Sequence, residues 1–381
     1  MNKYYKRQAM KILQAFIIFL SATNCISQIH IDIDVHSRVN KNNEEVMAVL
    51  NVYEKYLNSR PDNVQINNPF WCEADKAKFQ DFDFTRAFLY GEQPLDDLSK
   101  TYRFIVLSIE KEEESYAIRT AIIAKDVTQP YMKQQNPWAI TRLYAIRENN
   151  TWKLKNAFDF KTKNWKTISE SNINYHFPPD VILDKNEILK SKLFCDSVSK
   201  LLQIKSWQAF DYYITTSGDK QSELLGFDFA YAAYTTGMAL KSNILLGGTG
   251  SAFYPHEFTH HVAEEKNIKH KLIKEGLATW LGGSNGETFI QNLQTLSKAI
   301  RNSDTLTVDK VIDLTWGWNV NAFYTSGGLF CKLVYEKNGI IGLNRLFSIP
   351  ANDNVKLKEE LMKLLNTKNL NDLWRKELLK Y

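Results

Sequence analysis

The segment HEFTH at residues 256–260 constrains the fold of this chain more than any other part of the sequence. Residues i and i+4 of an α-helix lie one turn apart on the same face, so His256 and His260 can bind one metal ion together. Glu257 points slightly around the helix, where it can accept a proton without binding the metal. Pro255 suits the first turn of such a helix. The segment therefore predicts a zinc site carried by a helix.

A second helix is expected to supply the third ligand. Fourteen residues separate His260 from Glu275, and residues 270–283 have an apolar face that ends at two glycines. The intervening residues leave room for the first helix to end and the chain to reverse, so Glu275 can reach the ion. Two histidines and a glutamate leave a fourth position open, which is typical of catalytic zinc sites. Three other side chains are the alternatives for this ligand: Glu264, Glu265 and His270.

The neighbouring histidines have less specific roles. His261 comes five residues after His256 and lies off the ligand face, so we expect a surface or supporting position for it. His270 is expected to help start the second helix.

The N-terminal half has the pattern of a small domain with one helix and an antiparallel sheet. Residues 41–60 have helical periodicity, residues 102–111 and 115–124 are strand-like, and residues 139–160 suggest a hairpin around Asn149 and Asn150. One long helix on a curved sheet is the natural packing. Over residues 40–165 this pattern resembles the cone-shaped fold of nuclear transport factor 2 and its relatives, although it carries no motif. We expect a spacer or binding role for this domain.

The overall fold class is therefore expected to be α+β, with a second domain that is mainly helical and has a short edge-strand sheet. The pair Pro178-Pro179 marks the junction, which gives domains at 28–177 and 178–381. A strand is expected at 209–217. Helices of the second domain are expected at residues 187–202, 258–265, 271–281, 288–301, 323–336, 355–365 and 370–379.

The first 27 residues predict a secretory signal. They hold four basic residues and no acid, and the apolar run at 12–22 is too short to span a bilayer. Cleavage is expected between Asn24 and Gln28, which leaves no stable membrane span and a secreted, periplasmic or cell-surface protein. Lipidation of Cys25 and an uncleaved anchor are the alternatives. Cleavage lowers the formal net charge from +5 to about +1 (5 − 4), so no electrostatic argument supports nucleic-acid binding.

The four cysteines give no metal-binding pattern, because no CxxC or Cys/His spacing is present. Cys195 and Cys331 could form a disulfide in an exported protein, but buried free thiols are the favoured interpretation.

The segments HEFTH and KEGLATW together resemble the gluzincin (peptidase MA-like) metallopeptidases over residues 178–345. The resemblance implies one Zn²⁺ held by His256, His260 and Glu275, with Glu257 as general base, and a peptide or protein substrate. The downstream segment FYTSGG resembles a family helix whose tyrosine, in the aminopeptidase branch, steadies the tetrahedral intermediate. The matching residue is Tyr324, for which a packing role is the alternative.

Three departures from the family pattern refine this expectation. No segment resembles the GAMEN motif that grips a free amino terminus, which favours an endopeptidase. The segment SNILLGGTGS at 242–251 stands where the family commonly has a strand at the edge of the cleft. Thr279 replaces the acid that supports a histidine ligand, so another group must orient that ring. A catalytically silent, secreted zinc-binding scaffold is the alternative function, but it would show a lost base or ligand, and all four positions are intact.

Overall fold

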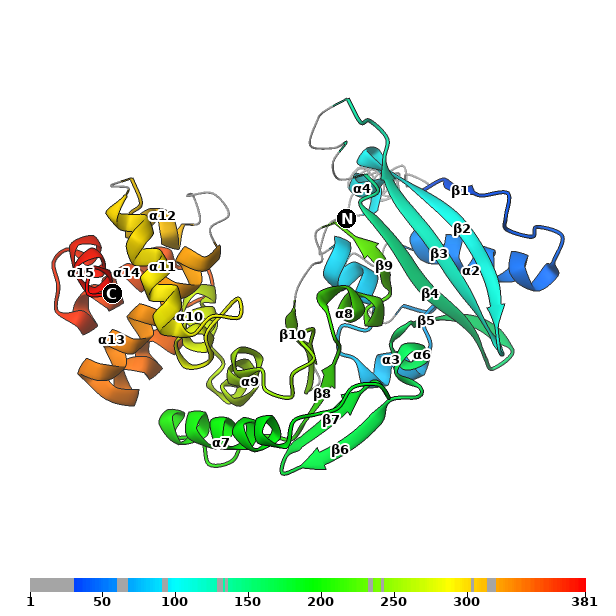
Figure 1. Ribbon diagram of the computed structural model, residues 1–381. Helices are drawn as coiled ribbons and strands as arrows, with labels where there is room; N and C mark the ends of the chain where they lie inside the picture. Colours follow the sequence, from blue (N-terminus) through cyan, green and yellow to red (C-terminus); the bar gives the residue numbers. More distant parts are fainter. Residues whose placement is uncertain are drawn as a thin grey trace, which may run out of the picture. The chain divides into compact units, whose positions relative to one another are not determined.

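A computed structural model describes residues 31–59, 68–90, 95–128, 133, 136–231, 236–240, 243–302, 305–313 and 320–381. The signal segment, including Cys25, lies outside the described residues. The chain is a mixed α and β protein with two mixed sheets (Figure 1). It divides into two compact units, one formed by residues 1–73 and 83–155 and the other by residues 74–82 and 156–381. Residues 74–82 and 156–177, which the sequence analysis assigned to the first domain, thus belong to the second unit.

The first unit contains one long helix and a twisted sheet. Helix α2 (Glu44–Leu57) begins at Asn43, whose side chain accepts hydrogen bonds from two backbone amides of the first turn. Strands β2 (Tyr102–Glu112), β3 (Ser115–Ala124), β4 (Ala139–Glu148) and β5 (Thr151–Asn156) follow one another in the sheet, and β1 (Ile33–Val35) pairs in parallel with β2. Three shorter helical segments complete this part of the chain: α3 (Glu73–Lys78), which crosses into the second unit, the π-helix η1 (Arg86–Tyr90) and α4 (Leu95–Thr101).

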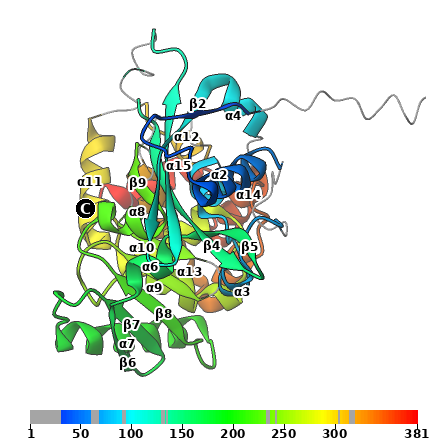
Figure 2. The ribbon, with the colours of Figure 1, turned by 90° about the vertical axis from the view of Figure 1, so that its right-hand side faces the viewer.

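The second unit contains a sheet with the order β10-β11-β8-β7-β6. Its strands are β6 (Lys166–Glu170), β7 (Ile173–Phe177), β8 (Phe210–Ile214), β10 (Gly237–Leu240) and β11 (Ile244–Gly247), and a further strand of the unit is β9 (Phe227–Ala230). The two outer pairs are antiparallel, and the inner pairs β7–β8 and β8–β11 are parallel. Helix α7 (Lys185–Leu202) is the crossover between the parallel strands β7 and β8. Both views show α7 close to β6 and β7 (Figure 2).

Helices form the rest of the second unit. They are α6 (Phe158–Thr162), α8 (Gly218–Leu224), α9 (Pro255–Val262), α10 (Lys271–Gly282), α11 (Phe289–Arg301), α12 (Val308–Ile312), α13 (Val320–Phe347), α14 (Asn354–Leu365) and α15 (Leu370–Leu378), with the short 3₁₀ segment η2 (Glu264–Lys266) after α9. Helix α13 is kinked at Gly339, whose φ of 60° is not helical. One apolar core joins the sheet to these helices, and its members include the fully or almost fully buried Phe258, Leu277 and Phe330. None of the helices in the described ranges is long and apolar enough to cross a membrane.

The structure differs from the sequence expectations at the edge of the second sheet. The segment around residues 242–251 does form a strand, β11, but that strand lies inside the sheet between β10 and β8. The edge strand is β10, which no sequence pattern indicated. The favoured interpretation of Cys195 and Cys331 is confirmed, because both are buried free thiols, and Cys72 is buried as well.

Candidate metal centre

Helix α9 carries the first two side chains of the candidate site. Pro255 occupies its first turn, and Phe258 anchors its opposite face in the core, where its ring packs edge-on against Tyr212 at 5.1 Å. Because Phe258 fixes the rotation of the helix, His256 and His260 project together from the other face. Their rings are 5.0 Å apart and nearly perpendicular.

Helix α10 carries the third side chain and is held in place by unusually close packing against α13. A Cβ atom on Gly276 would lie 2.3 Å from the backbone of Gly327, and one on Gly327 would lie 2.3 Å from the carbonyl oxygen of Leu272. Any larger residue at these positions would therefore push the two helices apart. The close approach brings Tyr324 of α13 to the same cavity as Glu275 of α10.

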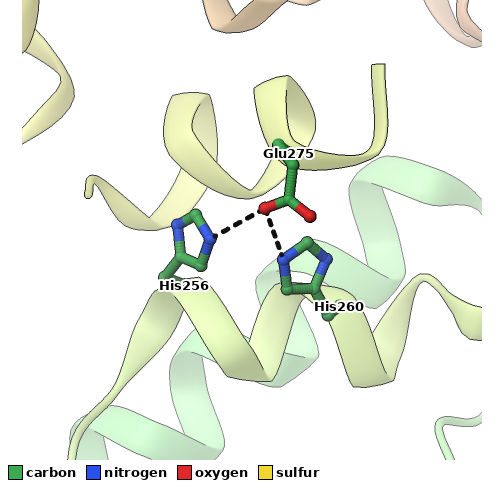
Figure 3. A group of neighbouring side chains, drawn as sticks. All are labelled: His256, His260 and Glu275. Carbon is green, nitrogen blue, oxygen red and sulfur yellow. Dashed lines mark ion pairs between the residues drawn. The ribbon is translucent and has the colours of Figure 1, made fainter. Parts of the chain in front are cut away.

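The three side chains converge with the spacing of a metal site. One carboxylate oxygen of Glu275 lies 3.5 Å from His256 Nε2 and 3.2 Å from His260 Nε2 (Figure 3). Ligands at about 2.0–2.1 Å from a tetrahedral zinc ion are roughly 3.3 Å from one another, so the observed separations fit such an ion. Among the described residues, His256, His260 and Glu275 are the group of three whose ligand atoms lie close enough to one another to hold a metal ion. The triad can therefore hold one.

The third-ligand alternatives do not reach this point. Glu264 and Glu265 are exposed, and the nearest histidine to Glu264 is His261, at 4.0 Å. His270 is buried at the start of α10, and its Nε2 lies 3.1 Å from the side-chain oxygen of Asn354.

A backbone carbonyl orients the His256 ring. The Nδ1 atom of His256 lies 2.7 Å from the carbonyl oxygen of Gly283 in a buried hydrogen bond. A carbonyl only accepts, so Nδ1 must carry a proton, and Nε2 is the nitrogen that faces Glu275 and that a metal ion could bind. Thr279, which stands where the family pattern has an acid, is fully buried, and its hydroxyl has no hydrogen-bond partner among the described residues. The backbone carbonyl of Gly283 therefore orients the His256 ring, although the sequence indicates Gly283 only as the end of a helix.

The two glycines at the end of α10 allow the close approach that the hydrogen bond between His256 and the Gly283 carbonyl requires. A Cβ atom on Gly282 would lie 2.5 Å from the backbone nitrogen of His256. Gly283 has a φ of 77°, and a Cβ atom there would lie 2.3 Å from the carbonyl oxygen of Glu287. Only glycine at both positions lets the end of α10 touch the start of α9.

His261 faces away from the triad, as its position on the helix predicts. Its Nε2 lies 3.0 Å from the carbonyl oxygen of Gln208, and its ring packs on Phe210 at 4.5 Å. It is buried and not on the surface, and it helps to join α9 to the segment that precedes β8.

The electrostatics of the triad are those of an anion between two imidazoles. Burial by itself would raise the pKa of Glu275, but hydrogen bonds from His256 and His260 outweigh it and hold that pKa well below the usual value. Glu275 is therefore ionised at neutral pH, as a metal ligand must be.

Two further groups border the triad. Glu257 is 7% exposed, and burial raises its pKa although both histidines oppose the shift. The Tyr324 ring lies parallel to that of His256, with the ring centres 5.9 Å apart. Burial and then the charge of Glu275 raise the pKa of Tyr324, so its hydroxyl keeps its proton and can donate a hydrogen bond.

The triad opens onto a large cavity of about 980 Å³. Its walls come from β10, the start of α9, α10, Tyr324, and the loop of residues 282–288. Among the described strands β10 pairs with β11 and is the last in the sheet order, and Gly237 and Ala239 of β10 line the cavity wall. A second cavity of about 210 Å³ shares Ala239, His260 and Lys274 with the first. The site therefore has room for an extended ligand that runs past the triad.

No family model matches this chain. No curated protein matches it either.

Proposed function

We propose that this chain is a secreted zinc-dependent endopeptidase of the gluzincin type. The observation that carries the proposal is the buried group of His256, His260 and Glu275, in which both histidines turn Nε2 toward one carboxylate oxygen. Zinc is the metal that best fits two imidazoles and one carboxylate with an open fourth position. The adjacent Glu257 supports an enzyme over a silent binding protein, because a structural zinc site does not need a buried base beside it.

The roles of the side chains follow from their chemistry. His256, His260 and Glu275 would hold the zinc ion, which would supply Lewis-acid chemistry to the substrate carbonyl and the attacking water. Glu257 accepts the proton of that water as it attacks, from a buried position on the same helix as the two histidines. It can then pass the proton to the leaving nitrogen. Tyr324 donates a hydrogen bond to the oxygen that becomes negatively charged when the carbonyl carbon turns tetrahedral.

The cavity supports a polypeptide as the substrate. An extended peptide can lie along β10 at the cavity wall, where contacts with the strand backbone would not depend on the sequence of the peptide. The sequence has no GAMEN-like segment to bind a free amino terminus. Peptides with both termini blocked should therefore be cleaved as well as free ones, which is the distinction between an endopeptidase and an aminopeptidase.

Export belongs to the same proposal. The first 27 residues have the composition of a cleaved signal, although they lie outside the described residues. Mass spectrometry of the mature protein should find an N-terminus between residues 25 and 28. A full-length product that starts at Met1 would contradict export, and a diacylglyceryl group on Cys25 would place the protein on a membrane surface instead.

The decisive experiment combines metal analysis with hydrolysis of a blocked peptide library. The parent protein should bind one zinc ion per chain and cleave peptides, and a chelator should abolish the cleavage. Glu257→Gln should keep the zinc and lose roughly 10²–10⁴-fold in rate, because it removes the base but no ligand. The matched control is Glu264→Gln, which replaces an exposed carboxylate just after the same helix and should keep full activity. Zinc binding with no cleavage of any peptide would favour the silent scaffold.

A further inference from the structure

The second sheet has two edges, and they are very different. Strand β10 at one edge borders the cavity of the metal centre, while β6 lies at the other edge. Among the described residues β6 pairs with β7 alone, and all five of its residues are exposed. An exposed strand edge is a template for pairing with another strand, and proteins usually protect it with bulges, prolines or several charges. Residues 166–170 contain no proline and only two charged residues, one at each end.

An apolar groove lies directly beside this edge. It encloses about 590 Å³ between β6, the end of β7, the residues before α7 and the first turns of α7. Three of its apolar side chains are exposed: Ile182 at 93%, Leu189 at 55% and Ile168 at 44%. A nearly fully exposed isoleucine beside other exposed aliphatic side chains is typical of a surface that a partner covers.

The sequence of β6 is complementary to itself. Lys166, Ile168 and Glu170 alternate along the strand and all line the groove. If two copies of β6 pair in antiparallel fashion about a two-fold axis at Ile168, each Lys166 faces the Glu170 of the other copy. The two Ile168 side chains then meet at the axis, and opposite residues in such a pair have Cβ atoms about 4.5–5.5 Å apart.

From this pattern we propose that the protein forms a symmetric dimer in which the two β6 strands pair antiparallel about Ile168. The occupant of the groove is a second copy of this chain, since a two-fold interface needs a surface that is complementary to itself. The pairing joins the two sheets into one and places the exposed Ile182 and Leu189 of both copies at the interface. The cavity beside β10 lies at the opposite end of the strand order from β6, so the dimer does not depend on the proposed peptidase function.

The other charges of the groove are compatible with this arrangement. The ammonium group of Lys166 donates to the carbonyl oxygen of Pro179 at 2.7 Å, and its remaining hydrogens are free to reach a carboxylate. Lys192 is already paired with Asp196 at 2.5 Å. Lys185 is exposed at the start of α7 and can keep its charge in water at the rim.

A charge exchange tests the register of the dimer. Light scattering of the mature protein should show a dimer at roughly 100 μM, because weak dimers also form at that concentration. Lys166→Glu alone and Glu170→Lys alone should each weaken the dimer about tenfold, because each creates two like-charge pairs. The double exchange should restore it. Lys190→Glu makes the same charge change on α7 outside the groove and should have no effect.

A cysteine at the axis tests the geometry directly. In a Cys25→Ser background the remaining thiols at 72, 195 and 331 are buried, so a new cysteine is the reactive one. With a mild oxidant Ile168→Cys should form a covalent dimer, whereas Ser169→Cys, on the other face of the strand, should not. A monomeric parent would overturn the proposal. So would a dimer that keeps its strength in both single charge variants, or one that Ser169→Cys links as well as Ile168→Cys.

Discussion

Glu275 and Tyr324 border the same cavity, but the two side chains are expected to affect different steps. Glu275 lies within 3.5 Å of both histidine Nε2 atoms. Glu275→Ala removes one of three ligands, so the zinc affinity should fall by more than the roughly 10–100-fold typical of losing an outer hydrogen-bond partner. Activity should fall with the zinc content. Competition with a chelator measures the affinity, and a variant that kept full zinc would reject Glu275 as a ligand.

Tyr324→Phe should instead leave the metal in place. The change keeps the ring that stacks on His256 and removes only the hydroxyl that donates to the developing negative charge. We expect a loss of roughly 10²–10³ in kcat, with little change in zinc content or KM. Tyr335→Phe is the control, because that tyrosine lies on the same helix but packs on Trp280. If both variants had parental kcat, Tyr324 would be a packing residue.

The sequence predicted which three side chains come together but not the group that orients the His256 ring. His256, His260 and Glu275 could be found because helical periodicity alone places the two histidines on one face and an acid on a second helix. The carbonyl of Gly283 could not be found in that way. Every residue has a carbonyl, and which one meets His256 depends on how closely α9 and α10 approach.

At the scale of helices and strands, the sequence predicted most reliably the elements whose pattern of apolar residues is long. Helix α2 and the strands β2 and β3 were predicted, since their apolar positions repeat over ten residues or more. The four-residue strand β10 was missed. Its conformation depends on pairing with β11 and not on its own residues, and short strands have weak preferences of their own. The attachment of residues 74–82 to the second unit depends on contacts distant in sequence, among them the 2.6 Å ion pair of Lys78 with Asp159.

The end of α10 gives a prediction at this scale. In Gly283→Ala the new Cβ atom would collide with the carbonyl oxygen of Glu287, so the loop must shift and carry the Gly283 carbonyl away from His256. Zinc affinity should fall about 10–100-fold. Gly286→Ala is the matched control, because Gly286 has a similar φ of 75° but open space around its Cβ position. Equal zinc affinity in the two variants would show that the carbonyl does not support the site.

At the scale of the whole molecule, the two compact units should respond differently to the metal. All three candidate ligands lie in the second unit, so the proposed zinc ion would bind the folded state of that unit and not the first. A ligand at 1,000 times its Kd stabilises the folded state by about 4 kcal/mol. Removing zinc with a chelator should therefore speed hydrogen exchange in α9 and α10, while β2 and β3 should keep their protection.

Glu257→Gln should respond as the parent does, because it retains all ligands, and Glu275→Ala should already exchange fast without a chelator. Equal loss of protection in both units would mean that they unfold together, and no change in α9 and α10 would mean that the triad holds no metal that stabilises the fold.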